Sequence, residues 1–110
     1  MSFMICVISM EYISDNYMDI TDIGSIAALF NFSRSHFTVR FKKATGITPY
    51  DYLTKCRISA AKQLLTNTNR SIEHISEACG FGTYSSFIRA FKSKTGLSPI
   101  AYKRLVLHTD

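Results

Sequence analysis

Apolar residues recur every three or four positions along most of this chain, which is the spacing typical of amphipathic helices. No stretch alternates apolar and polar residues, so no β-strand is predicted. The pattern therefore predicts an all-α fold of seven helices. We expect them at about residues 5–17, 23–30, 34–45, 49–65, 72–79, 83–95 and 99–107.

Capping residues mark the ends of these helices. A serine, threonine or aspartate that precedes a helix can accept a hydrogen bond from its free backbone N–H groups. A glycine after the last turn readily adopts the left-handed backbone that ends a helix. The expected N-caps are Thr21 or Asp22, Ser33, Thr48, Ser71 and Ser98, and the expected stops are Gly46, Gly80 and Gly96. Pro49 and Pro99 stand at first helical positions, where a proline is well tolerated.

The apolar stripes predict which side chains are buried. In the first helix the stripe contains Ile5, Ile8, Tyr12, Ile13 and Tyr17. In the third and sixth helices it contains Phe37, Phe41 and Ala44, and Phe87, Ala90 and Phe91.

An internal repeat runs through the helical pattern. Many residues of the first half of the chain recur 50 positions later in the second half. Before about residue 33 the matching residues are 49 positions apart. The matched pairs include Ser35 and Ser85, Phe37 and Phe87, Phe41 and Phe91, Lys42 and Lys92, Gly46 and Gly96, Pro49 and Pro99, and Tyr52 and Tyr102. The chain is therefore expected to contain two copies of one structural unit.

Each copy has the features that a helix-turn-helix requires. A short helix and a longer helix flank a turn residue that tolerates a left-handed backbone, Asn31 in one copy and Gly80 in the other. A small residue, Ala27 or Ser76, stands where the two helices must cross closely. We expect residues 1–47 to form the first unit with its N-terminal helix, 48–66 a connecting helix, and 67–110 the second unit with the C-terminal helix.

Charge is unevenly distributed along the chain. Residues 1–30 hold four acidic and no basic residues, whereas residues 31–110 hold all thirteen basic residues and four acidic ones. The second helix of each copy contains basic residues and no acidic residue. Such faces suit the major groove of DNA, where polar groups reach base edges and lysines contact phosphates. The connecting helix would be about 25 Å long, which could let both units reach one face of a single duplex, where successive major grooves lie about 34 Å apart.

The sequence resembles the DNA-binding domain of the AraC/XylS family of bacterial transcription regulators over about residues 8–105. The motifs that carry the resemblance lie at residues 72–81, 85–92 and 95–102 in the second copy, 26–46 in the first, and 52–65 in the central helix. It implies seven helices with two homeodomain-like helix-turn-helix units joined by a long central helix. It also implies a cytoplasmic, nucleoid-associated transcription factor, usually an activator, that binds double-stranded DNA.

Carried over by position, the resemblance implies which residues contact DNA. The expected base contacts are Arg34, Ser35, Thr38 and Val39 in the first unit and Tyr84, Ser85, Ser86 and Arg89 in the second. The expected phosphate contacts are Ser33, Lys42, Lys43, Thr83 and Lys92. We expect Arg89 to bind a guanine through two hydrogen bonds, with a phosphate contact as its alternative.

The first unit departs from the family pattern at two adjacent residues. Val39 aligns with Arg89, and Arg40 aligns with Ala90 on the inward stripe. The Val39 side chain can contact a thymine methyl group but donates no hydrogen bond. We therefore expect the first unit to recognise fewer hydrogen-bond patterns on base edges than the second unit does. We expect one of two arrangements. Either the Arg40 side chain extends from a half-buried position to a phosphate, or the helix that carries it is slightly rotated about its axis.

No residue pattern indicates an enzyme, a cofactor or a metal site. The three cysteines, Cys6, Cys56 and Cys79, are widely spaced and are expected to be buried small apolar residues. A DNA-repair methyltransferase would need a reactive cysteine in a basic pocket. No run of apolar residues is long enough to span a membrane, which takes about 18–20 residues.

An alternative function from another class remains open. One helix-turn-helix unit could act as a protein-interaction module that docks on RNA polymerase or on a partner regulator. Steep salt dependence would favour DNA binding over such an interface. We expect the chain to bind DNA as a monomer unless a further domain dimerises it, because its two units can act together as a pseudo-dimer. These residues are not expected to form a sensor or dimerisation domain, so the chain is either a stand-alone regulator or a fragment of a longer one.

Overall fold

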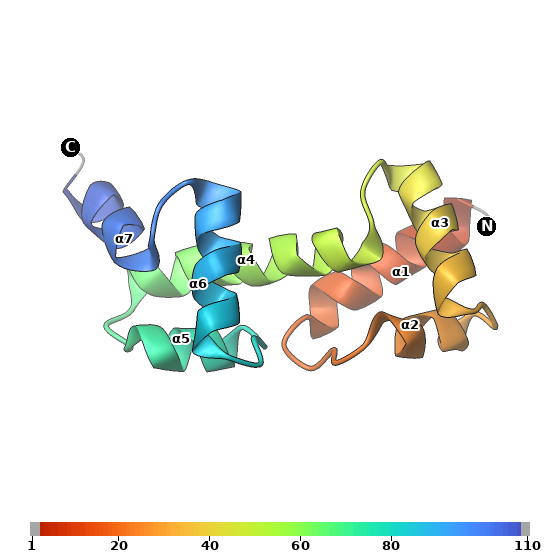
Figure 1. Cartoon of the computed structure of the whole chain (residues 1–110), viewed down its shortest axis with the longest axis horizontal. Coiled ribbons are helices and arrows are strands. Elements are labelled where there is room, and N and C mark those ends of the chain that lie inside the picture. Colours follow the sequence, from red (N-terminus) through yellow and green to blue (C-terminus); the bar gives the residue numbers. More distant parts are fainter. Residues whose placement is uncertain (1–2, 109–110) are drawn as a thin grey trace. The chain divides into compact units, whose positions relative to one another are not determined.

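The computed structural model describes residues 3–108, which form seven α-helices and, within that range, no strand (Figure 1). The all-α prediction is confirmed. The helices are α1 (Phe3–Asn16), α2 (Ile23–Leu29), α3 (Arg34–Thr45), α4 (Pro49–Asn67), α5 (Ile72–Ala78), α6 (Tyr84–Thr95) and α7 (Pro99–Leu107). None of these helices is long and apolar enough to cross a membrane.

The chain divides into two compact units, Met1–Cys56 and Arg57–Asp110, and the division falls inside α4. Each unit has its own core. In the first unit the buried apolar residues that pack together are Ile13, Ile20, Ile23, Ile26, Ala27, Phe37, Phe41 and Leu53. In the second they are Ile58, Ala61, Leu65, Ile75, Cys79, Phe87 and Phe91.

Aromatic rings occupy matching places in the two cores. The ring centres of Phe37 and Phe41 lie 5.7 Å apart, and those of Phe87 and Phe91 lie the same distance apart. Phe91 also contacts Tyr102 of α7 edge to face at 5.4 Å. The longer helix of each pair is thus fixed to its unit through two fully buried phenylalanines, which leaves its opposite face outward.

The turns between the paired helices have the predicted geometry. Asn31 and Gly80 both adopt positive φ, at 60° and 92°. Each turn is closed by a backbone bond, from Phe32 N–H to the carbonyl of Ala27 and from Phe81 N–H to that of Ser76. Ala27 and Ser76 are themselves buried. Both copies are therefore helix-turn-helix units.

The predicted helix caps are also observed. Asp22, Ser33, Ser71 and Ser98 accept hydrogen bonds from backbone N–H groups of α2, α3, α5 and α7 through their side chains. Thr83, which was expected as the first residue of its helix, is instead the N-cap of α6. Gly46 and Gly96 end α3 and α6 in the left-handed conformation.

The predicted core stripe of the first helix is partly wrong. Ile8 is 46% exposed and Tyr12 is exposed as well, whereas the buried residues of α1 are Cys6, Ser9 and Ile13. The Ser9 hydroxyl is satisfied inside the helix, because it lies 2.8 Å from the Ile5 carbonyl and 3.0 Å from that of Cys6. A serine that bonds its own helix can be buried, and apolar spacing alone does not identify it.

Two smaller expectations about the stripes also need correction. Ala44 of α3 is exposed, although it was assigned to the buried stripe. Cys56 is only half-buried, whereas Cys6 and Cys79 are buried as expected.

Candidate nucleic-acid interface

The outward faces of α3 and α6 carry the residues expected to contact DNA. Each helix buries two phenylalanines and leaves the opposite side open. The exposed members of the predicted set are Ser33, Arg34, Ser35, Val39, Arg40, Lys42, Lys43, Thr83, Tyr84, Ser85, Arg89 and Lys92. Thr38 and Ser86 are half-buried. None of the fourteen residues is part of a core.

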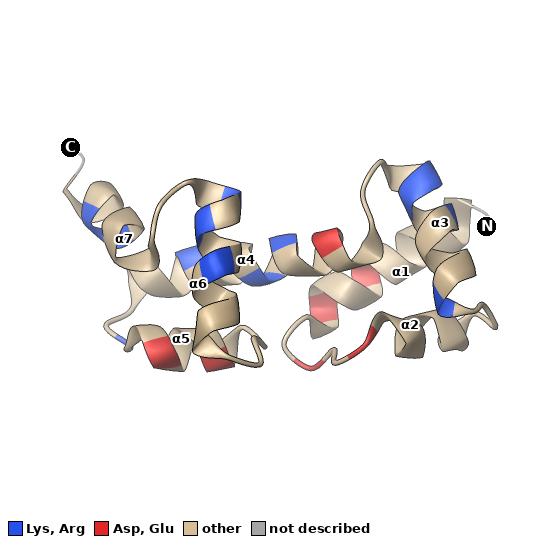
Figure 2. Cartoon of the chain, in the orientation of Figure 1, with Lys and Arg blue, Asp and Glu red and all other residues tan. Residues whose placement is uncertain are grey.

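Positive charge gathers on these two helices. Figure 2 shows basic residues along both α3 and α6, with no acidic residue on either. The acidic residues of the first unit lie in α1, in the segment before α2 and at the start of α4. Each outward face can therefore approach a polyanion without repulsion from a carboxylate of the same helix.

The two N-cap hydroxyls stand at the start of these helices. Ser33 Oγ accepts from the backbone N–H of His36 at 3.1 Å, and its own hydroxyl proton remains available to a phosphate. Thr83 Oγ1 accepts from Ser86 N–H at 3.0 Å and lies 2.8 Å from Ser86 Oγ. Free N–H groups and the positive end of the helix dipole favour anions at such a position.

Arg34 begins α3 and forms an ion pair across the turn. Its Nη1 lies 3.7 Å from Oδ1 of Asp22, the carboxylate that also caps α2 by accepting from Gly24 N–H. Both side chains are more than half exposed. Water screens an exposed pair of this kind, so Arg34 can exchange Asp22 for a DNA acceptor at little cost.

Arg40 is exposed, so it does not occupy the half-buried position that its alignment with Ala90 indicates. Its Nε donates to Nε2 of His36 at 3.2 Å. Sequence reasoning missed this pair, although the spacing of four residues on one helix was a signal for it.

Arg89 lies in a different setting from either arginine of α3. Among the residues that the structure describes, it makes no hydrogen bond or ion pair within the chain. It lines a shallow hollow on α6 together with Tyr84, Ser85 and Ile88. Tyr84 is 43% exposed, and Val39, the counterpart of Arg89 on α3, is 64% exposed. All donors of the Arg89 guanidinium are therefore available to an external acceptor.

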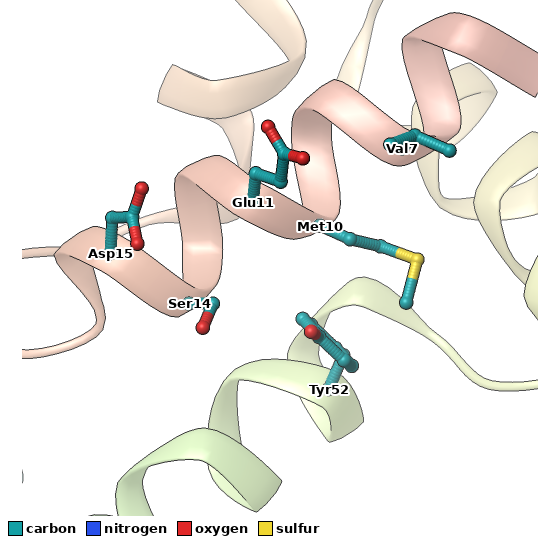
Figure 3. A pocket seen from close by; sticks show the side chains of 6 residues that line it. All are labelled: Val7, Met10, Glu11, Ser14, Asp15 and Tyr52. Atoms are coloured by element: carbon teal, nitrogen blue, oxygen red, sulfur yellow. The ribbon is translucent and has the colours of Figure 1, made fainter.

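A pocket of about 370 Å³ lies between α1 and α4 in the first unit, and no residue of α3 lines it. Figure 3 shows Met10 of α1 and Tyr52 of α4 pointing toward one another across it. Glu11 and Asp15, one helical turn apart, also line it, and in Figure 3 their carboxylates point away from Tyr52. The pocket combines an apolar wall with two carboxylates, which differs in chemistry from the basic faces.

The cysteines are placed where their thiols are poor nucleophiles. Burial raises the pKa of the Cys79 thiol to about 11, and the nearby charge of Arg57 lowers it only in part. Burial also raises the pKa of Cys56, against smaller lowering effects of Tyr52 and Lys55. Cys6 is buried in α1.

We therefore predict slow thiol modification in the folded protein. Because burial raises the pKa of the Cys79 thiol well above 7, very little of it is ionised at pH 7, and the thiolate is the reactive form. In a short iodoacetamide pulse read by mass spectrometry, Cys79 should stay unlabelled at pH 7, and labelling should increase with pH up to about 11. All three cysteines should be labelled rapidly in urea. Rapid labelling of native Cys79 at pH 7 would contradict the burial.

Comparisons with known proteins agree with this geometry. The family described as a helix-turn-helix domain matches residues 26–105. The probable transcriptional regulator LumQ of Photobacterium leiognathi is 33% identical over 97 residues, which cover 81% of this chain and 38% of LumQ. The bifunctional transcriptional activator/DNA repair enzyme AdaA of Bacillus subtilis is 35% identical over 95 residues, covering 86% and 45%. This chain thus spans less than half the length of these relatives.

Two solved DNA-binding or C-terminal domains match over nearly their whole length. The C-terminal domain of AraT, a response regulator from Geobacillus stearothermophilus, is 32% identical with a TM-score of 0.84, and the match covers 96% of this chain and 91% of that one. The DNA-binding domain of AdpA, solved in complex with a target DNA, is 26% identical with a TM-score of 0.84, covering 91% and 90%. With its two helix-turn-helix units and their basic second helices, the chain belongs to the AraC/XylS family of bacterial transcription regulators, as a DNA-binding domain of that family.

Proposed function

We propose that this chain binds double-stranded DNA in a sequence-specific manner and places α3 and α6 in successive major grooves of one duplex. The observation that carries the proposal is the pair of outward helix faces that hold arginines, lysines and hydroxyl groups but no carboxylate. Groups of this kind reach base edges in the major groove, while lysines neutralise phosphates.

The proposal assigns separate roles to the residues on each face. Base edges are read by Arg34, Ser35, Thr38, Val39, Tyr84, Ser85, Ser86 and Arg89. Phosphates are bound by Ser33, Arg40, Lys42, Lys43, Thr83 and Lys92. The chain binds as a monomer in the bacterial cytoplasm, unless a further domain dimerises it, and its role there is transcription activation.

Selection of duplexes from a random library by the purified chain, at about 100 mM salt, tests this function. Two short motifs about one helical turn apart are expected, because each unit should read one major groove. A single motif would indicate that only the second unit reads bases. No enrichment at all would contradict sequence-specific binding by this chain.

Lys92→Ala is predicted to weaken binding of all duplexes alike. Lys92 lies in the last turn of α6 and is exposed, so it should neutralise one phosphate. The slope of log affinity against log salt concentration should fall by about one. Lys55→Ala is the matched control, because Lys55 is an exposed lysine outside α3 and α6. The phosphate assignment fails if both variants keep the slope of the unsubstituted protein.

A second candidate function is docking on RNA polymerase or a partner regulator, and the pocket between α1 and α4 favours it. Its apolar wall and its two carboxylates, Glu11 and Asp15, suit a lysine or arginine side chain of a partner protein. The Glu11→Gln, Asp15→Asn double variant removes both carboxylates and should retain binding to the selected duplex, because neither residue lies on α3 or α6. It should activate transcription less well in a reconstituted assay with RNA polymerase. Unchanged activation would remove the support that the pocket gives to docking.

A further inference from the structure

His36 and Arg40 form a pair on the outward face of α3. They stand one helical turn apart, both are exposed, and Arg40 Nε donates to His36 Nε2 at 3.2 Å. Ser35, Val39 and Lys43 line the same shallow hollow. The pair therefore lies among the residues that the proposed function assigns to DNA.

The imidazole ring of His36 packs on one side against the first unit. It contacts the ring of Phe32 edge to face, with the ring centres 4.8 Å apart. Phe32 is half-buried and packs against the core of the first unit. The backbone N–H of His36 is bound by the N-cap Ser33. The ring thus rests on a residue that packs against the core, and from there it accepts a hydrogen bond from Arg40.

The chemistry of the pair leaves Arg40 fully charged. A guanidinium group only donates, so His36 Nε2 is the acceptor in this bond. The bond uses Nε of Arg40 and leaves the terminal Nη groups free. Arg34, by contrast, pairs with the carboxylate of Asp22, which partly neutralises it.

The second unit has no equivalent pair. By the shift of 50 residues, Ser86 stands in place of His36 and Ala90 in place of Arg40. The first unit in turn has Val39 in place of Arg89. Compared with the second unit, the first unit has valine at the base-reading position, an arginine at the next position along the helix, and a histidine that accepts a hydrogen bond from that arginine.

We propose that His36 is a positioning residue that holds the Arg40 guanidinium ready to bind a DNA phosphate. This inference rests on the proposed function. Prearranging a long side chain saves the entropy that would otherwise be lost when it is immobilised on the ligand. His36 acts through Arg40 and makes no contact of its own with DNA.

Affinities of substituted chains for the selected duplex test the proposal. His36→Ala should bind about 3- to 10-fold more weakly, the range expected for one lost hydrogen bond. His36→Gln should restore most of the affinity, because a side-chain amide oxygen can accept from Arg40. Adding His36→Ala to Arg40→Ala should cause no further loss. His36→Ala should keep the salt slope, whereas Arg40→Ala should lower it by about one.

His74→Ala is a closely matched control. His74 is also exposed and also lies three residues after a serine N-cap, with its N–H bound by Ser71. Four residues further along, the chain has Ala78 rather than an arginine. His74→Ala should therefore bind like the unsubstituted chain, and thermal melts followed by circular dichroism should show every variant folded.

Three outcomes would overturn the proposal. Equal affinities of His36→Ala and His74→Ala would show that the pair does not contribute. Failure of His36→Gln to restore binding, or additive losses in the double variant, would show that His36 does not act by accepting a hydrogen bond from Arg40. If the unsubstituted chain selects no duplex, the proposed function itself fails, which is a different result from any of these.

Discussion

Replacing Phe91 by alanine is expected to lower the free energy of unfolding by about 3–5 kcal/mol. Phe91 is fully buried, and its ring centre lies 5.7 Å from that of Phe87 and 5.4 Å from that of Tyr102. Removing the ring leaves a cavity between α6 and α7 that the surrounding rings fill only in part. Urea denaturation followed by circular dichroism measures the loss.

Phe3→Ala is the control for that experiment. Phe3 is also a phenylalanine in a helix, but it is 83% exposed, and its replacement should change stability by less than about 0.5 kcal/mol. Phe41→Ala should resemble Phe91→Ala, because the two rings occupy corresponding places in the two cores. A denaturation curve of Phe91→Ala equal to that of the unsubstituted chain would contradict the assignment of Phe91 to the core.

Helix ends were predictable from the sequence because they depend on local chemistry. Ser33 caps α3 and Gly46 ends it, and neither role requires knowledge of which helix packs against which. The repeat made the turn positions predictable as well, since Asn31 and Gly80 occupy matching places and both adopt positive φ.

Side-chain partners and the packing of α1 were harder to predict. Ser9 is buried through bonds to its own helix, which hydrophobic spacing cannot reveal. The ion pair between Asp22 and Arg34 depends on how the turn brings the start of α2 to the start of α3, so the sequence alone does not predict this pair. The bond between His36 and Arg40 lies within one helix, and its spacing could have been read from the sequence.

Arg89→Ala is expected to cost about 1–3 kcal/mol of binding energy and to relax the preference at one base position. All donors of the Arg89 guanidinium are free of partners among the described residues, so it can form two parallel hydrogen bonds to the major-groove edge of guanine. Duplex selection with the variant should give a motif that is degenerate at a single position and otherwise unchanged. Lys92→Ala provides the comparison, because it should lower affinity without changing the motif.

The aligned position in the first unit offers the reverse experiment. Val39 occupies on α3 the place that Arg89 has on α6, and it is 64% exposed. Val39→Arg should therefore introduce a preference for guanine at one position of the other half of the motif. If Arg89→Ala instead weakens all sequences equally, Arg89 binds a phosphate, and Val39→Arg should then add affinity without adding a preference. The two substitutions together thus decide whether this position reads bases or only binds the DNA backbone.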